Sequence, residues 1–95
     1  MVFQKLDPLL HSELRLAIMS TLISVEEADF VHLKKITEAT AGNLSVQLEK
    51  LSQAGYITVT KTFEGKKPRT LCAVTDRGRS AFEAYVNTLK SYIQL

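Results

Sequence analysis

Small and amide side chains are concentrated between residues 40 and 50, and their chemistry is hydrogen-bonding recognition rather than catalysis. Asn43 and Gln47 each carry donor and acceptor groups, a combination that matches the major-groove edge of adenine. Ser45 can hydrogen-bond a base or a phosphate, and Val46 can contact a thymine methyl group. Gly42 would let the N-terminus of a helix approach a phosphate. These residue types fit a surface that contacts duplex DNA, and the alternative is an ordinary surface helix with a few polar residues. The position of this segment between a tight turn and a basic hairpin favours DNA contact.

Positive charge is concentrated in residues 56–80, which carry six Lys and Arg against two acidic residues, a net charge of +4 in a chain whose total is +2. The cations that we expect to contact DNA are Lys50, just before this segment, and Lys61, Lys66, Lys67 and Arg69 within it. Arg69 is the strongest candidate, because a guanidinium binds phosphate bidentately. Arg77 and Arg79 either bind phosphates or pair with acidic neighbours. A solvated hairpin would have the same composition, so charge alone leaves both interpretations open.

The residues that could support other chemistry are scattered. Cys72, His11 and His32 are isolated along the chain, so the sequence predicts neither a metal site nor a bound cofactor. There is no Ser/His/Asp order, paired carboxylate or phosphate-binding glycine loop, which argues against an enzyme. A single cysteine, no signal peptide and no apolar run of roughly 20 residues together predict a cytoplasmic protein without a membrane anchor.

The elements that position these residues follow from capping residues and hydrophobic periodicity. Ninety-five residues predict one domain, residues 1–95, that is mainly α with a small β-hairpin, an α+β fold. We expect N-caps at Ser12, Thr40 and Thr75. The predicted helices are 11–23, 31–38, 40–54 and 76–93. The predicted dimerisation segment contains the last helix and extends to residue 95. A very short strand is expected at 29–31, and a hairpin, residues 57–75, has strands 56–63 and 69–75 and the turn Glu64–Pro68.

The helix over 40–54 has a core side and an outward side. The predicted core side consists of Ala41, Leu44, Leu48 and Leu51. The outward side consists of Gly42, Val46, Glu49 and Lys50, with Asn43, Ser45 and Gln47 at its edges. In the preceding helix we expect Leu33 and Ile36 to be buried. The candidate DNA-contacting residues therefore lie on or beside the solvent face of one helix, next to its cap Thr40.

The last helix, 76–95, carries an apolar stripe that is bulky for so small a chain: Phe82, Tyr85, Val86, Leu89 and Ile93. We expect it to pack against the same helix of a second copy, together with four residues of an N-terminal arm, residues 1–10: Phe3, Leu6, Leu9 and Leu10. The alternative is a monomer in which the helix folds back on the first helix. A two-fold dimer would present two recognition helices about 34–36 Å apart.

Two segments together resemble a known family. The run from Gly42 to Leu51, followed by Ala54-Gly55-Tyr56-Ile57, is similar to the recognition helix and next strand of MarR-like and ArsR-like regulators. Lys66-Lys67-Pro68-Arg69-Thr70 and Thr75-Asp76-Arg77-Gly78-Arg79 resemble the wing and last-helix start of a compact single-domain subgroup. The likeness covers nearly the whole chain from His11. It implies a winged helix-turn-helix with an additional C-terminal dimerisation helix.

This resemblance implies a homodimeric transcription regulator that contacts double-stranded DNA through Asn43, Ser45, Val46, Gln47 and the wing. The sequence departs from ArsR-like helices at Val46, where a basic residue is common, and it lacks their clustered metal ligands. Any small-molecule effector would have to bind at the dimer interface, and no residue pattern names one. The alternative function is a winged-helix protein-interaction module without specific DNA binding, because a fold alone does not establish a function.

Overall fold

The computed structural model describes residues 3–93, so residues 1–2 of the predicted arm and 94–95 of the predicted last helix lie outside the described residues. The predicted order of three helices, a hairpin and a last helix is confirmed. The elements are α1 (Glu13–Ile23), β1 (Ala28–Asp29), α2 (Phe30–Thr37), α3 (Ala41–Gln53), β2 (Ile57–Glu64), β3 (Lys67–Val74) and α4 (Asp76–Ile93).

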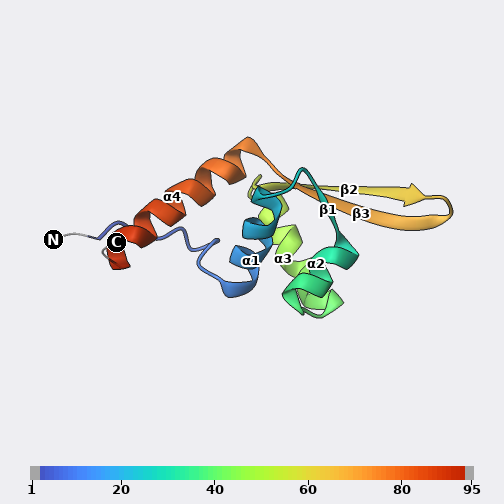
Figure 1. Ribbon diagram of the computed structural model, residues 1–95, viewed down its shortest axis with the longest axis horizontal. Coiled ribbons are helices and arrows are strands. Elements are labelled where there is room, and N and C mark those ends of the chain that lie inside the picture. The colour runs from blue at the N-terminus through green and yellow to red at the C-terminus, as the bar shows by residue number, and fades with distance from the viewer. Residues whose placement is uncertain (1–2, 94–95) are drawn as a thin grey trace.

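The molecule is elongated, with extents of 57 × 25 × 21 Å. Helices α1, α2 and α3 form the central body, the β2–β3 hairpin projects from one end, and α4 extends from the other (Figure 1). The N-terminal segment runs beside α4 at that second end. The hairpin, which the sequence assigned to DNA contact together with α3, and α4, which it assigned to dimerisation, therefore lie at opposite ends of the long axis, with α3 between them.

Side-chain caps set the helix starts. The Ser12 hydroxyl accepts from the Arg15 amide at 3.4 Å and the Thr40 hydroxyl accepts from the Asn43 amide at 3.1 Å, which confirms both predicted N-caps. The Asp29 carboxylate accepts from the His32 amide at 2.8 Å, an N-cap that was not predicted from the sequence. Because Asp29 caps α2, the short strand ends there and the helix begins at Phe30, one residue earlier than predicted.

The three strands form one antiparallel sheet in the order β1-β3-β2. Strands β2 and β3 pair from Ile57 with Val74 as far as Glu64 with Lys67, leaving only Gly65 and Lys66 in the turn. The predicted five-residue turn was wrong because Pro68 continues the strand opposite Phe63. Strand β1 reaches only Leu71 and Cys72, so Pro68 lies on an edge where its missing N–H group costs no ladder hydrogen bond.

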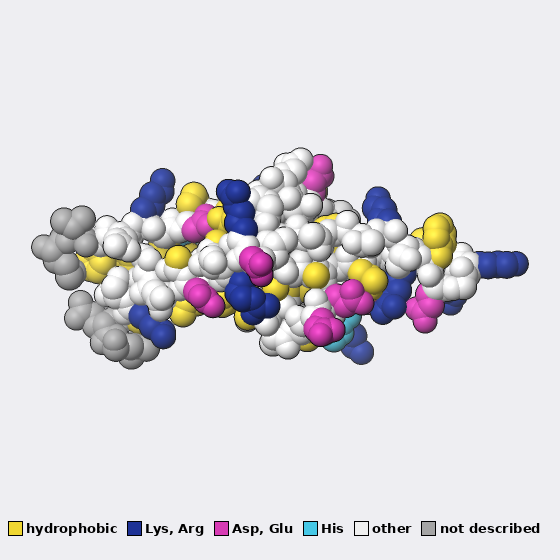
Figure 2. Space-filling view, turned by 90° about the horizontal axis from the view of Figure 1, so that it is seen from above, with side chains coloured by type: hydrophobic (Ala, Val, Ile, Leu, Met, Phe, Trp, Pro, Cys, Tyr) yellow, Lys and Arg dark blue, Asp and Glu magenta, His cyan; other side chains and the backbone are white. Residues whose placement is uncertain are grey.

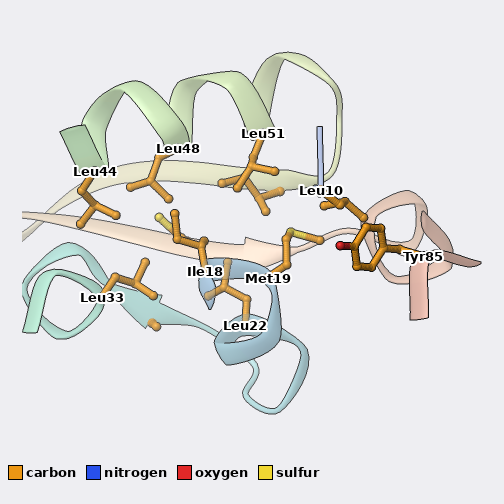
Figure 3. Close-up of a cluster of buried hydrophobic side chains, with 12 residues drawn as sticks. Leu10, Ile18, Met19, Leu22, Leu33, Leu44, Leu48, Leu51 and Tyr85 are labelled. Carbon is orange, nitrogen blue, oxygen red and sulfur yellow. The ribbon is translucent and has the colours of Figure 1, made fainter. Parts of the chain in front are cut away.

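The core lies between α1 and α3 and is closed by the base of the sheet. Leu44, Leu48 and Leu51 of α3 point toward the α1 side chains, as Figure 3 shows. Its buried residues are Leu10, Ile18, Met19, Leu22, Ala28, Leu33, Leu44, Leu48, Leu51, Ile57, Cys72 and Tyr85. Two residues predicted to be buried are exposed. Ala41 lies in the first turn of α3, and Ile36 is 49% exposed because the short α2 turns Leu33 toward the core instead.

The last helix and the arm share part of this core, which corrects the predicted interface. Leu10 is fully buried and Tyr85 is 4% exposed within one chain, so neither can form the surface of a dimer. The Tyr85 hydroxyl lies 3.0 Å from Nδ1 of His11. Further along, the rings of Phe3 and Tyr92 stack with centroids 4.5 Å apart, and the Tyr92 hydroxyl donates to the Gln4 carbonyl at 2.6 Å. The arm therefore packs along its own α4.

Candidate nucleic-acid interface

The outward side of α3 is polar and open. Gly42, Asn43, Ser45, Val46 and Lys50 are all exposed, whereas Leu44, Leu48 and Leu51 are buried. A Cβ atom at Gly42 would meet nothing within 4 Å, so the N-terminal turn of α3 is unobstructed on that side. Thr40 caps this turn and is itself exposed. The free N–H groups of the turn and the helix dipole favour an anion at this end.

The two edges of α3 have different neighbours. Ser45 and Glu49 line a groove between α3 and the hairpin, which has a volume of about 630 Å³ and is also lined by Phe30, Leu48, Ser52, Gln53, Val59, Lys61 and Thr70. Asn43 lies on the other edge, in a shallow hollow that it shares with Glu13 and Leu14 of α1. The groove thus brings Lys61 of the hairpin beside Ser45 of α3, as the sequence predicted for these two elements.

Gln47 is not free on the surface. It is half-buried, its Oε1 accepts from the Arg15 guanidinium at 2.5 Å, and its Nε2 donates to Oδ1 of Asn43 at 3.0 Å. Gln47 was expected to pair with adenine through both groups. Here both groups already have partners within the chain, so this expectation has to be revised.

The hairpin has two different faces. Side chains alternate along a strand, so Val59, Lys61 and Phe63 point to the side that borders α3, and Pro68 lies opposite Phe63. Phe63 is 70% exposed, next to the turn that contains Lys66. Figure 2 shows Lys and Arg side chains and an exposed hydrophobic side chain at this end of the molecule. Phe63 was predicted only as a strand residue, although its two-residue spacing from Lys61 is enough to place both side chains on one face.

Arg69 lies on the other face of the hairpin. It is opposite Thr62, one position out of phase with Lys61 and Thr70. Its NH2 group lies 3.4 Å from Oδ2 of Asp29 and its Nε lies 3.8 Å from Oε2 of Glu64. The same register places Lys67 opposite Glu64 on the Arg69 face, so Lys61 and Lys67 lie on different faces of the hairpin, near the turn that contains Lys66. Arg69 has two acidic partners within the chain. Arg69 anchors the hairpin to the start of α2.

Other chemistry finds no site in the part of the chain that the structure describes. Residues 3–93 contain no group of three His, Cys, Asp or Glu side chains placed to hold a metal ion. Cys72 is fully buried, as predicted for a packing residue, and burial raises the pKa of its thiol to about 11. Among these same residues, none of the helices is both long enough and apolar enough to cross a bilayer.

The family model of the winged helix DNA-binding domain matches residues 14–93. The chain belongs to this family. The match includes all four helices and the hairpin, which is the wing of the fold, and α3 takes the place of the recognition helix in this fold. The predicted resemblance to winged-helix transcriptional regulators is thereby confirmed, and solved structures of similar fold include a MarR-family regulator.

Two relatives of this winged helix match it over most of their own length, and PadR matches it over about half. It is 32% identical over 76 residues to uncharacterized protein MJ0432 of Methanocaldococcus jannaschii, which covers 80% of this chain and 83% of the relative. It superposes on a transcriptional regulator homologue from Pyrococcus horikoshii OT3 with a TM-score of 0.84, 29% identity, and coverage of 90% and 85% of the two chains. Bacillus subtilis PadR, solved in complex with operator DNA, shares the fold with a TM-score of 0.69, 21% identity, and coverage of 79% and 48%.

Proposed function

We propose that this winged helix is a sequence-specific DNA-binding transcription regulator that acts as a homodimer. The observation that carries the proposal is that the polar outward side of α3 and the cationic hairpin border one groove, which Ser45 and Lys61 both line. A duplex could contact both surfaces at once, with α3 in the major groove and the wing on the flanking backbone or minor groove. A DNA-binding protein acts in the compartment that contains the genome. The free thiol of Cys72 fits a reducing compartment such as the cytoplasm.

Base contacts are assigned to the exposed side of α3. Asn43, Ser45 and Val46 can reach base edges, while Gly42 and the Thr40-capped first turn can approach a phosphate through backbone N–H groups. Lys50 provides a cation near the other end of the helix. Because α3 carries one lysine against one glutamate, most of the electrostatic affinity has to come from elsewhere.

Phosphate contacts are assigned to the wing. Lys61, Lys66 and Lys67 are exposed, and neither Lys66 nor Lys67 forms an ion pair with another residue of the described range 3–93. Lysines that neutralise phosphates release counterions, so the affinity of such a surface falls steeply with salt. Phe63, on the same face as Lys61, adds an exposed apolar group that can contact sugars or bases in the minor groove.

Dimerisation is assigned to the opposite end of the molecule. Phe82, Val86 and Leu89 remain half-exposed along α4, and Ile93 and Phe3 are exposed beyond them. A second copy packed on this surface by two-fold symmetry would bury these residues and leave both wings at the outer ends. Leu6 and Leu9 of the arm lie half-buried beside the core and would border the interface.

The test measures DNA affinity as a function of salt concentration for the wild type and for Lys66→Ala/Lys67→Ala. We expect the wild type to bind a random-sequence duplex with a steep salt dependence, and the logarithmic slope to fall by about 1 for each phosphate contact removed. The matched control is Lys5→Ala/Lys90→Ala, which removes two exposed charges from the end opposite the wing and should leave the slope unchanged.

Two results would contradict the proposal. If both double variants lower the slope equally, the wing makes no special contribution. If the wild type shows no salt-dependent DNA affinity at all, the chain is better explained as a winged-helix protein-interaction module.

A further inference from the structure

Three side chains connect the first helix to the outward edge of the recognition helix. The Arg15 guanidinium donates through Nε to the Leu9 carbonyl at 2.6 Å and through NH1 to Oε1 of Gln47 at 2.5 Å. Gln47 then donates from Nε2 to Oδ1 of Asn43 at 3.0 Å. The chain of contacts therefore starts at the N-terminal arm and ends at an exposed residue that faces solvent on α3.

The orientation of both amides follows from the chemistry of Arg15. A guanidinium has donors and no acceptor, so the Gln47 atom that it contacts has to be the oxygen. The Gln47 nitrogen then points to Asn43, and a nitrogen that donates has to meet the Asn43 oxygen. The NH2 group of Asn43 is thereby left outward, and it donates to no other residue in the part of the chain described.

We propose that Arg15 is a positioning residue for base recognition, which holds the Gln47 and Asn43 amides so that α3 presents the Asn43 NH2 group to DNA. This inference rests on the proposed function. It removes Gln47 from direct base contact and makes Asn43 a donor rather than a donor-acceptor pair.

The consequence is a changed base preference. In the major groove guanine presents two acceptors, N7 and O6, whereas adenine presents one acceptor, N7, and one donor, N6. An asparagine that is free to rotate matches adenine with both its groups. An asparagine held with its NH2 outward matches guanine better. We therefore expect guanine to be preferred over adenine at the base that faces Asn43.

The test selects binding sites from a randomised duplex library with the wild type, Arg15→Leu and Gln47→Glu. In Arg15→Leu both amides are free to rotate, so preference at one base position should shift from guanine toward adenine by about ten-fold. Gln47→Glu keeps an acceptor for Arg15 but can no longer donate to Asn43. Asn43 then turns its NH2 group to the new carboxylate and its oxygen outward, which favours the donor groups of adenine and cytosine.

Two further variants separate positioning from a structural role. Lysine is also a donor without an acceptor, so Arg15→Lys should retain the guanine preference. Arg79→Leu removes one exposed arginine of α4 and should leave the base preference as in the wild type. A purely structural role for Arg15 would lower affinity for all sites without changing preference at one. If Arg15→Leu does not fold, Gln47→Glu still tests the inference. That variant retains Arg15 and therefore also the hydrogen bond from Arg15 to the Leu9 carbonyl.

The failures of the two proposals are distinguishable. If the wild type selects no sites and shows no salt-dependent affinity, the proposed function is wrong. If the wild type selects sites and both Arg15→Leu and Gln47→Glu select the same ones, the chain is a DNA-binding regulator but Arg15 does not set its specificity.

Discussion

Tyr56 joins the end of the recognition helix to the N-terminal arm. Its hydroxyl donates to Oδ2 of Asp7 at 2.5 Å, and its carbonyl accepts from the Thr75 amide at 3.0 Å. Burial, followed by the hydrogen bond and the negative charge of Asp7, raises the pKa of Tyr56 to about 12 from its ordinary value of 10.0. The Tyr56 side chain thus helps to hold the arm near the start of the wing. It can donate this hydrogen bond only while its hydroxyl is protonated.

This contact predicts a loss of stability in alkali. Because the folded-state pKa of Tyr56 is the higher one, its contribution is fully present below pH 10 and is lost as the pH rises through 12. Tyr56→Phe should lower the free energy of unfolding by about 1 kcal/mol near pH 8 and should lose less stability than the wild type between pH 10 and 12. Urea unfolding at several pH values measures both. Cys72 is present in both proteins, so its own titration cancels in the comparison. Parallel pH curves would show that folding does not raise the pKa of Tyr56, and hence that its hydroxyl is neither buried nor bonded to Asp7.

Single residues were predictable from the sequence where their own chemistry decides their place. Thr40 was identified as a cap and Cys72 as a packing residue, because a hydroxyl before a helix and a lone thiol in an apolar strand have few alternatives. Partners distant in sequence were not predictable. The Arg15–Gln47 contact spans 32 residues and the Arg69–Asp29 contact spans 40, and neither leaves a local pattern.

At the scale of elements, α4 is attached to the start of the sheet by a close backbone approach. The first turn of α4 is capped by Thr75, whose hydroxyl accepts from the Gly78 amide at 3.0 Å and donates to the Gly55 carbonyl at 2.6 Å. A Cβ atom at Gly78 would lie 2.0 Å from the Tyr56 carbonyl oxygen. Backbone atoms cannot move aside as a flexible side chain does, so only glycine fits where α4 passes the backbone of Tyr56, one residue before β2.

Two glycine substitutions in helices should therefore have opposite effects. Gly78→Ala should lower the free energy of unfolding by about 2 kcal/mol or more, since the added methyl group has to displace the Tyr56 carbonyl. Gly42→Ala, where nothing lies within 4 Å, should raise it by about 0.5–1 kcal/mol by reducing the freedom of the unfolded chain. Chemical denaturation of both variants measures the difference. If Gly78→Ala is as stable as Gly42→Ala, α4 does not approach the strand as closely as described.

The order and type of elements followed from the sequence, but their pairing details did not. Hydrophobic periodicity and capping residues located all four helices, because each carries its own local signal. The hairpin register did not follow from the sequence. The segment Glu64–Pro68 has turn composition throughout, and only strand pairing decides that Gly65 and Lys66 form the turn. Likewise, the pairing of β1 with β3 joins residues more than forty apart and is decided by the packed core.

At the scale of the whole molecule, the two ends of the long axis carry different surfaces. The wing end carries Lys61, Lys66 and Lys67, while the α4 end carries exposed and half-exposed aromatic and aliphatic side chains beside Lys5 and Lys90. Figure 1 shows these two ends. The whole apolar stripe of α4 was predicted to lie in a dimer interface, because a linear pattern does not tell which residues a chain can bury by itself. The structure divides that stripe. Tyr85 closes the chain's own core, and Phe82, Val86, Leu89 and Ile93 remain for a partner.

This division makes Ile93 the position at which dimerisation can be tested without disturbing the fold. Ile93 is 55% exposed in one chain, so Ile93→Lys should cost the protomer little stability but place a charge in the proposed interface. We expect light scattering after size exclusion to change from dimer to monomer. Affinity for a two-site duplex should fall on the order of 100-fold as the two recognition helices become independent, with affinity for one half-site retained.

Asn87→Lys, an exposed position off the apolar stripe, is the matched control and should remain dimeric. A dimeric Ile93→Lys variant would place the interface elsewhere. A wild type that is monomeric at all concentrations would remove the dimer from the proposal, and DNA contact through α3 and the wing would remain proposed.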